Sequence, residues 1–447
     1  MRVVGNIASD SEVVATASGA ITAGKPVVIN ADGTVQFAGP TSTTISAGIG
    51  SEVTFESAAA RPQHGTFDSN SNKVVVTYQD SDNSSYGTAI IGTIDDSDNS
   101  ISFGSPVVFE SAGVDGIAAV FDSSNNKVVI GYRDGGNSYY GTAIVGTVSG
   151  TSISFGTAAT FWTTNTPNVV GASFDTNVNK VLFTFSNNIH DGYGIAGTVS
   201  GTSISFGSSH RFETGQVRFL SNAFDNNSNT HVAIYTDHDN SQYGTSCVIS
   251  VASDGTVTSA TPVVWESAET SSQDIAFDTT NNKFLIAFRQ VGSSSRGTGI
   301  VGTVSGTTIS FGTKNDWNSV TTQSPALAFN DASGTFVILY DESSGTDVKY
   351  IEATISGTSV TFGTAAVADT DGSTDYNDVI FDSNVKRTVL LYQDSGESSY
   401  GKARVLASAA TYDVNSLTSE NFIGFAKDAV ADGAVATIQT ANSIARD

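Results

Sequence analysis

The stretch Phe121–Gly156 reads FDSSNNKVVIGYRDGGNSYYGTAIVGTVSGTSISFG, and versions of it recur along the chain. It holds short runs rich in β-branched residues, separated by turns of Asp, Ser, Asn and Gly, without a helical period. A Phe-Asp pair (Phe-Asn in one copy) marks seven copies, with phenylalanines at positions 67, 121, 174, 224, 277, 329 and 381. A steady period of about 50 residues with four strand-like runs per copy is typical of a β-propeller.

Each copy predicts four strands, A to D, so we expect an all-β chain with seven four-stranded blades. In the quoted copy the four runs are Ile117–Phe121, Lys127–Tyr132, Gly141–Val148 and Ser152–Phe155. The last copy has no strand D after Gly401, whereas residues 43–57 resemble a strand D without a blade of their own. We therefore predict that residues 43–57 close blade seven as its outer strand, which leaves no open sheet edge.

Residues 1–42 and 409–447 lie outside the repeats, and each segment reads as two short strands around an Asp-Gly turn. In a closed propeller of this topology the two junctions lie side by side on one face. The two ends are therefore predicted to combine into one small β-domain. The propeller, residues 43–408, is then an insertion in that domain.

The composition is acidic, with 20 Lys and Arg against 44 Asp and Glu and a formal net charge of −24. This charge repels phosphate backbones and anionic lipid, so we expect neither nucleic acid nor a membrane surface as a partner. The single cysteine, Cys247, is expected to be a small buried hydrophobe. The first residues lack a continuous apolar run, so we expect no signal peptide, and no run is long enough for a membrane-spanning helix.

Catalytic motifs are not found in the sequence. None of the five histidines has zinc-binding spacing, and neither a nucleophile elbow nor a phosphate-binding loop occurs. We therefore predict that the chain is not an enzyme. The aspartates of the Phe-Asp pairs are expected to cap the turn between strands A and B.

The loops between strands B and C are rich in Asp and Asn, whose oxygens suit Ca²⁺. The competing interpretation, which we favour, is that these side chains cap their own turns. If calcium binds, the first of these loops is the best candidate, with Asp80, Asp82 and Asn83 as ligands. We expect no other cofactor.

The segments between strand D and the next strand A differ most among the copies. Constant strands with divergent loops are a common way to build a binding face. We therefore predict outward loops whose ligand-binding residues are Arg61, His64, Trp162, Asn165, Trp317 and Tyr376. The aromatic members can stack on sugar rings, and the competing interpretation is that they cap the fold.

The terminal segments AGKPVVINADGTVQFAG (23–39) and ENFIGFAKDAVADGAVATIQT (420–440) carry a resemblance. They are similar to the small β-domains of head-decoration and tail-associated proteins of tailed bacteriophages, especially phages of marine bacteria. The Ser-, Asn- and Gly-rich repeats also resemble propeller inserts in such virion proteins.

The resemblance implies a structural or adhesive virion protein, on the capsid or the tail, that assembles as a homo-oligomer or in many copies. Its terminal domain would dock on other virion proteins at the particle surface. Its propeller would be displayed outward, where attachment to host surface glycans is one role. The alternative function is a bacterial extracellular carbohydrate-binding or adhesive propeller, which the phage-like ends disfavour.

Overall fold

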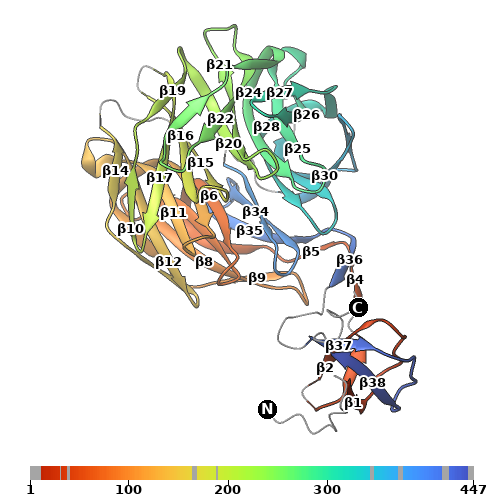
Figure 1. Cartoon of the computed structure of the whole chain (residues 1–447). Coiled ribbons are helices and arrows are strands. Elements are labelled where there is room, and N and C mark those ends of the chain that lie inside the picture. The colour runs from red at the N-terminus through yellow and green to blue at the C-terminus, as the bar shows by residue number, and fades with distance from the viewer. Residues whose placement is uncertain are drawn as a thin grey trace. The chain divides into compact units, whose positions relative to one another are not determined.

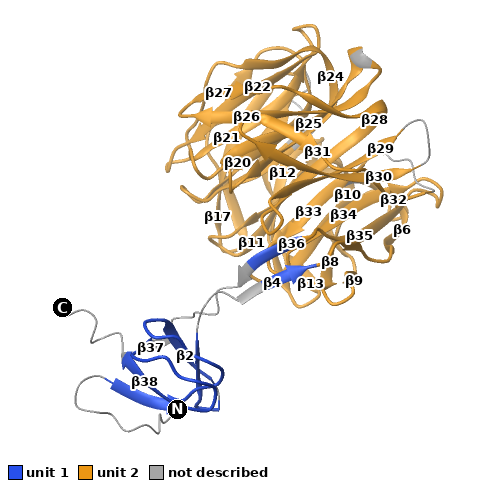
Figure 2. Cartoon of the chain, turned by 90° about the vertical axis from the view of Figure 1, so that its right-hand side faces the viewer, with its two compact units in different colours: residues 1–45, 410–447 blue, residues 46–409 orange. Residues whose placement is uncertain are grey.

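The computed structural model describes residues 12–30, 32–37, 41–163, 169–187, 190–342, 347–370, 376–414 and 422–440. They belong to two compact units, coloured separately in Figure 2. Unit 1 holds residues 1–45 and 410–447, and unit 2 holds residues 46–409. The sequence placed these junctions after residues 42 and 408.

The expected all-β class is confirmed. In the described ranges, the elements other than strands are two single turns of 3₁₀ helix, at Gly135–Asn137 and Val291–Ser293. None of the helical segments in this part of the chain has the length and apolar character needed to cross a membrane.

Unit 2 is a seven-bladed β-propeller whose antiparallel blades are arranged around a ring (Figure 1). The strands of blades one to three are β6 (Val53–Asp68), β7 (Lys73–Asp80), β8 (Tyr86–Asp95), β9 (Ser100–Phe103), β10 (Val107–Asp122), β11 (Lys127–Asp134), β12 (Tyr140–Ser149), β13 (Ser152–Phe155), β14 (Ala159–Trp162), β15 (Val169–Asp175), β16 (Lys180–Ser186), β17 (Gly192–Ser200), β18 (Ser203–Phe206) and β19 (His210–Glu213).

The strands of blades four to seven follow the same order. They are β20 (Val217–Asp225), β21 (Thr230–Asp237), β22 (Tyr243–Val251), β23 (Val257–Ser259), β24 (Val263–Asp278), β25 (Lys283–Gln290), β26 (Arg296–Ser305), β27 (Thr308–Phe311), β28 (Asn315–Asn330), β29 (Thr335–Glu342), β30 (Val348–Ser356), β31 (Ser359–Phe362), β32 (Ala366–Asp369), β33 (Asp378–Asp382), β34 (Arg387–Asp394) and β35 (Tyr400–Ala407).

The outer strand D of a blade has two parts. In blade two, β13 pairs with the end of β12 and β14 pairs with its beginning. At four places, β6, β10, β24 and β28, the second part continues without a break into strand A of the next blade. The sequence predicted outward loops there, and at these places that prediction is wrong. Register shifts along these strands allow one strand to bend from the edge of one sheet into the next.

The N-terminal part of unit 2 closes the ring, as predicted. β5 (Gly48–Ile49) pairs with the end of β35, and the first half of β6 pairs with its beginning. The paired residues run from 48 to 59, whereas the sequence analysis chose 43–57. Residues 43–45 belong instead to β4 (Thr41–Ile45), which pairs with β36 (Ala410–Val414).

Unit 1 contains strands from both ends of the chain, as predicted. Its five-stranded antiparallel sheet has the order β1 (Glu12–Thr16), β38 (Val435–Thr440), β37 (Phe422–Ala426), β2 (Pro26–Ile29) and β3 (Val35–Phe37). Its core includes fully buried Val27 and Val35 from the N-terminal segment and Ala436 and Ile438 from the C-terminal segment. The two segments therefore share one hydrophobic core.

The Phe-Asp aspartates cap the turns between strands A and B, as predicted. In blade two, Asp122 Oδ1 accepts hydrogen bonds from the backbone nitrogens of Ser124 and Asn125, at 2.9 and 3.0 Å. The same pair of bonds occurs in all seven blades, with Asn330 as the acceptor in blade six. Cys247 is fully buried in a hydrophobic cluster, also as expected, and burial raises the pKa of its thiol to about 12.

The glycine that begins strand C packs directly against an aromatic ring of strand D. A Cβ atom on Gly141 would lie 2.6 Å from Cε2 of Phe161, a distance that real Cβ contacts do not reach. The same close approach occurs in five other blades, in the pairs Gly87–Phe109, Gly192–Phe212, Gly244–Trp265, Gly297–Trp317 and Gly401–Phe55. The glycine is therefore required by space and not by backbone conformation.

Blade six reverses the sizes of this pair. Val348 stands at the position of the glycine, and Ala368 stands at the position of the aromatic residue. Both side chains are fully buried in one cluster. The total volume is thus roughly kept while the larger group changes strand.

This exchange predicts a coupling between Gly141 and Phe161. Gly141→Val should destabilise unit 2 by about 1–3 kcal/mol because the new side chain overlaps the ring. Phe161→Ala should cost about 3–5 kcal/mol through the cavity that it leaves. The double variant should cost less than the sum by at least about 1 kcal/mol, because it recreates the pair of blade six. Urea unfolding followed by circular dichroism measures all three values.

The matched control combines Gly141→Val with Phe109→Ala, which removes the corresponding ring of another blade. That combination should be additive, because Phe109 packs on Gly87 and not on Gly141. Equal coupling in the two double variants would contradict the packing argument.

Lys402 joins the two parts of blade seven that are farthest apart in sequence. Its side chain is 4% exposed, and its ammonium nitrogen lies 2.8 Å from Glu52 Oε1 and 2.6 Å from Glu397 Oε2. Glu52 also accepts a 2.6 Å hydrogen bond from the hydroxyl of Tyr392. The N-terminal segment is therefore held to blade seven by a buried cation as well as by strand pairing.

We predict that Lys402→Met weakens ring closure. Breaking a fully buried ion pair costs about 3–5 kcal/mol, and the loss here should be smaller because Glu397 is half-exposed. Amide hydrogen exchange should accelerate first in β5 and the first half of β6, before the remaining blades. Uniform acceleration throughout unit 2 would show that Lys402 does not act at the closure.

Candidate functional site

The inner strands converge on one cavity, named the channel cavity here. It has a volume of about 210 Å³ and is lined by residues from the inner-strand segments of six blades, which places it on the propeller axis. The position three residues before each anchor phenylalanine contributes to this lining. Its residues in the cavity are His64, Gly171, Ser221, Asp274, Ala326 and Asp378.

Three of these side chains join neighbouring blades through one repeated contact. Each accepts a hydrogen bond from the backbone nitrogen two residues before the next anchor phenylalanine. The donors are Leu327 to Asp274 at 3.0 Å, Gly65 to Asp378 at 2.5 Å and Ala119 to His64 Nδ1 at 3.3 Å. The carboxylates of the cavity therefore also hold the ring together.

The two carboxyl groups have altered acidity. Burial raises the pKa of both Asp274 and Asp378 above the usual range of an aspartate, and hydrogen bonds oppose this effect. The charge of Asp274 raises the pKa of Asp378 further, while nearby His64, at 3.9 Å, lowers it. Ser221 Oγ donates a 2.7 Å hydrogen bond to Asp274. The cavity thus offers acceptor oxygens in an environment that disfavours anions.

Two amide side chains in the cavity wall each have one polar atom without a hydrogen-bonding partner in the described part of the chain. Asn222 is 9% exposed, and its Nδ2 donates to Thr184 Oγ1 at 2.7 Å. Gln273 is 7% exposed, and its Oε1 accepts from Thr236 Oγ1 at 3.3 Å. Within the described part of the chain, Asn222 Oδ1 and Gln273 Nε2 have no hydrogen-bonding partner. Such buried, unpaired groups are uncommon in proteins because they lose hydration.

A strained aromatic residue directly precedes one of the residues that line this cavity. Strand A has a bulge five residues before the anchor phenylalanine in blades two, four, five and six, where φ is positive. Three blades place Gly116, Ser272 or Ser324 there, but blade four places Phe219, with φ of 50°. This conformation costs a non-glycine residue about 1–3 kcal/mol. Phe219 is 43% exposed and directly precedes Leu220, which lines the cavity.

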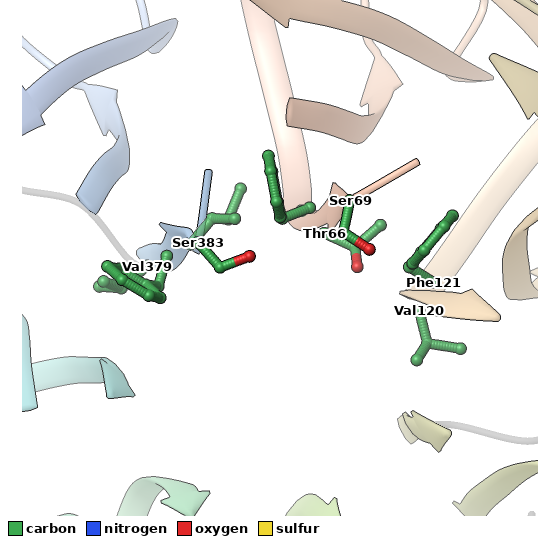
Figure 3. A pocket seen from close by; sticks show the side chains of 10 residues that line it. Thr66, Ser69, Val120, Phe121, Val379 and Ser383 are labelled. Atoms are coloured by element: carbon green, nitrogen blue, oxygen red, sulfur yellow. The ribbon is translucent and has the colours of Figure 1, made fainter. Parts of the chain in front are cut away.

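A second hollow, of about 430 Å³, lies at the level of the anchor phenylalanines. Figure 3 shows Thr66 and Ser69 between Val120 and Phe121 on one side and Val379 and Ser383 on the other. Its lining is mostly apolar side chains and hydroxyls from blades one, two and seven. None of the unpaired buried atoms found in the described part of the chain belongs to its lining.

Two of the predicted ligand residues lie on β6. Arg61 is exposed, and its Nη2 donates a 3.2 Å hydrogen bond to Ser399 Oγ. His64 lines the channel cavity, with its side chain 37% exposed. The two residues therefore lie on one strand, but only His64 lines the channel cavity.

Both predicted tryptophans belong to the blades and not to outward loops. Trp162 lies in β14, with its ring 4.9 Å from that of Phe185 and 4.7 Å from that of Tyr193. Trp317 lies in β28, with its ring 5.7 Å from that of Tyr340. The loop prediction was wrong for these two residues because Trp162 packs on rings of the next blade, whereas Trp317 covers Gly297 of strand C in its own blade.

The last two predicted ligand residues, Asn165 and Tyr376, have different outcomes. Asn165 lies outside the described residues. Tyr376 is half-buried and directly precedes Asn377, which lines the channel cavity. Of the predicted set, the structure brings His64 to the cavity and places Tyr376 next to a lining residue. Sequence reasoning missed Ser221, Asn222, Gln273, Asp274 and Asp378, although aligning the copies before the anchor phenylalanine shows their polar character.

The proposed calcium loop uses its first aspartate as a turn cap. Asp80 Oδ1 accepts a 3.1 Å hydrogen bond from the backbone nitrogen of Asn83, while the Asp82 and Asn83 side chains are exposed. Asp134, Asp237 and Asp394 cap the corresponding turns. Among described residues, no group of three His, Cys, Asp or Glu side chains is placed to hold a metal ion. Calcium at Asp80, Asp82 and Asn83 stays a prediction.

A buried Ser-His-Asp arrangement joins blades three and four. His231 Nδ1 is 2.7 Å from Ser173 Oγ, and its Nε2 is 3.5 Å from Asp175 Oδ2. His231 is fully buried, Asp175 caps its A–B turn, and Ser173 is 7% exposed. Burial lowers the pKa of His231, and the Asp175 carboxylate opposes this effect. The His231 imidazole therefore serves as a neutral link between blades.

His231 predicts an acid-sensitive step in stability. The unfolded chain binds a proton near the ordinary pKa of 6.5, whereas the buried imidazole binds it only at lower pH, so stability falls below pH 6.5. His231→Val, which copies Val128 and Val181 of blades two and three, should remove this loss. The stability of wild type relative to the variant should fall on acidification by up to about 1.4 kcal/mol per pH unit. Parallel stability curves from pH 7 downward would contradict the argument.

Comparison with known proteins adds to the assignment of the fold. No protein family model and no curated protein matches the chain. The β-propeller domain of Cps50 (Swd1) from Myceliophteria thermophila is similar, with a TM-score of 0.51 and 8% identity over 81% of this chain and 100% of that one. Raptor from Chaetomium thermophilum is also similar, with a TM-score of 0.52 and 10% identity over 83% of this chain and 29% of Raptor. These likenesses show a β-propeller fold.

Proposed function

We propose that this chain is a structural protein of a tailed-bacteriophage particle, on the capsid or the tail. Unit 1 docks on other virion proteins, and the propeller is displayed as a binding module. Support for the phage setting comes from the resemblance of segments 23–39 and 420–440 to small virion β-domains. The described parts of these segments lie in one sheet, from β2 and β3 to β37 and β38.

The observation that carries the proposal is the insertion topology. The propeller leaves unit 1 after Ile45 and returns at Ala410, and these two residues are paired neighbours in β4 and β36. A large ring can therefore be inserted without separating the strands of the docking sheet. This arrangement suits a small assembly domain that carries a display module.

The chemistry of the channel cavity supports binding rather than catalysis. Asp274 and Asp378 already accept backbone hydrogen bonds that join neighbouring blades. A general acid or base must gain and lose protons during each turnover, which would change these bonds. The net charge of −24 supports an exposed and soluble position and opposes a role in packaging nucleic acid.

The test uses particles of the phage or prophage that encodes this chain. Quantitative mass spectrometry of purified particles should find the chain in many copies, and antibodies against the propeller should label intact particles in electron micrographs. Disrupting the particles should not increase the labelling. Absence from the particles would end the virion proposal, and labelling only after disruption would end the proposal of outward display.

A further inference from the structure

We infer that the channel cavity binds a single neutral sugar ring, such as the terminal unit of a glycan. The inference deepens the proposed function, because it names the ligand class of the displayed module and moves the site from the outer segments to the propeller axis. Two independent features carry it, the unpaired amides of the wall and the strained Phe219, which directly precedes the lining residue Leu220.

The unpaired amides have opposite requirements. Asn222 Oδ1 needs a donor, and Gln273 Nε2 needs an acceptor. An ammonium group can only donate and a fully ionised phosphate ester can only accept, whereas a hydroxyl group does both. Each free atom belongs to a side chain that lines the cavity. Hydroxyl groups on adjacent carbon atoms match this mixed wall.

The charge of the cavity favours a neutral ligand. Asp274 and Asp378 supply acceptor oxygens, and Ser221 supplies a further hydroxyl beside them. An anionic sugar would meet two buried carboxyl groups in a chain of net charge −24. A metal ion lacks the ligands, because no three-residue cluster for one occurs in the described ranges.

Size and shape limit the ligand further. A volume of about 210 Å³ lies below the roughly 300–1,000 Å³ of sites for drug-sized ligands, which suits one ring and not an extended chain. Phe219 directly precedes Leu220 and offers an exposed aromatic surface. At the position of Phe219, blades two, five and six have glycine or serine. An aromatic face packs on the apolar side of a sugar ring while its hydroxyls face polar groups. This gives a reason for the strain at Phe219.

The test measures binding of single sugars to the purified full-length chain by saturation-transfer NMR and calorimetry. The panel holds neutral hexoses, deoxyhexoses and N-acetylhexosamines, together with the anionic hexuronates and sialic acid. We expect at least one neutral sugar to bind and the anionic sugars to bind at least tenfold more weakly. If no neutral sugar binds, or if the anionic sugars bind best, the inference is wrong.

Three variants place the ligand in the cavity. Phe219→Ser copies the serines of blades five and six, Asn222→Ala copies Ala172 of blade three, and Gln273→Leu copies Leu220 of blade four. Each substitution installs a residue that the repeat already accepts at that position, so the fold should persist. Each should weaken binding of the neutral sugar about tenfold or more, since each removes one contact.

Tyr139→Ser is the matched control. Tyr139 is also an exposed aromatic residue with positive φ, at 48% exposure, but it lies in a turn between strands B and C. Serine occupies the same position in other copies, as Ser85, Ser295 and Ser399. Unchanged binding in this variant is expected, and a loss equal to that of Phe219→Ser would contradict the cavity site. Sugar binding by a chain absent from particles would instead refute only the virion role.

Discussion

One steric constraint underlies the propeller: strand C must pass so close beneath a ring of strand D that a Cβ atom does not fit. The pair Gly141–Phe161 illustrates it, and five other blades repeat it. The glycine brings the outer strand against the sheet, and the ring fills the space between neighbouring blades. Blade six meets the same demand with Val348 and Ala368. What is kept is therefore a filled volume and not a residue type.

The axis follows a different rule from the outer parts of the blades. Close packing fixes the outer positions, but the position three residues before the anchor phenylalanine accepts Ala118, Gly171, Asp274 and His64 alike. Where this residue is polar, it can hold the backbone of the next blade. Where this residue is glycine or alanine, its small size leaves space in the cavity. Six of the seven similar sheets thus line a cavity whose wall is chemically uneven, and an uneven wall is what selective recognition requires.

The repeats allowed the blades, their order and the closure by the N-terminal strand to be predicted, because turn caps and alternating strands are local signals. Other features depend on neighbours that are distant in sequence. Asn222 and Gln273 meet in one cavity only because blades four and five are adjacent around the axis. The sequence alone favours a loop position for Trp317, because its packing on Gly297 is visible only in the structure. The continuity of β6 could not be predicted either, since its bulges depend on pairing with two different sheets.

The closure also sets an order on folding during synthesis. Lys402 and Glu52 are 350 residues apart, and Lys427 and Glu12, an ion pair of unit 1, are 415 apart. Neither unit can be completed until the C-terminal segments leave the ribosome. At about 5–20 residues per second, the edge of β6 stays without its partner strand for at least about 17 seconds. The charged residues Glu52 and Glu56 are features that hinder pairing between such edges of different chains.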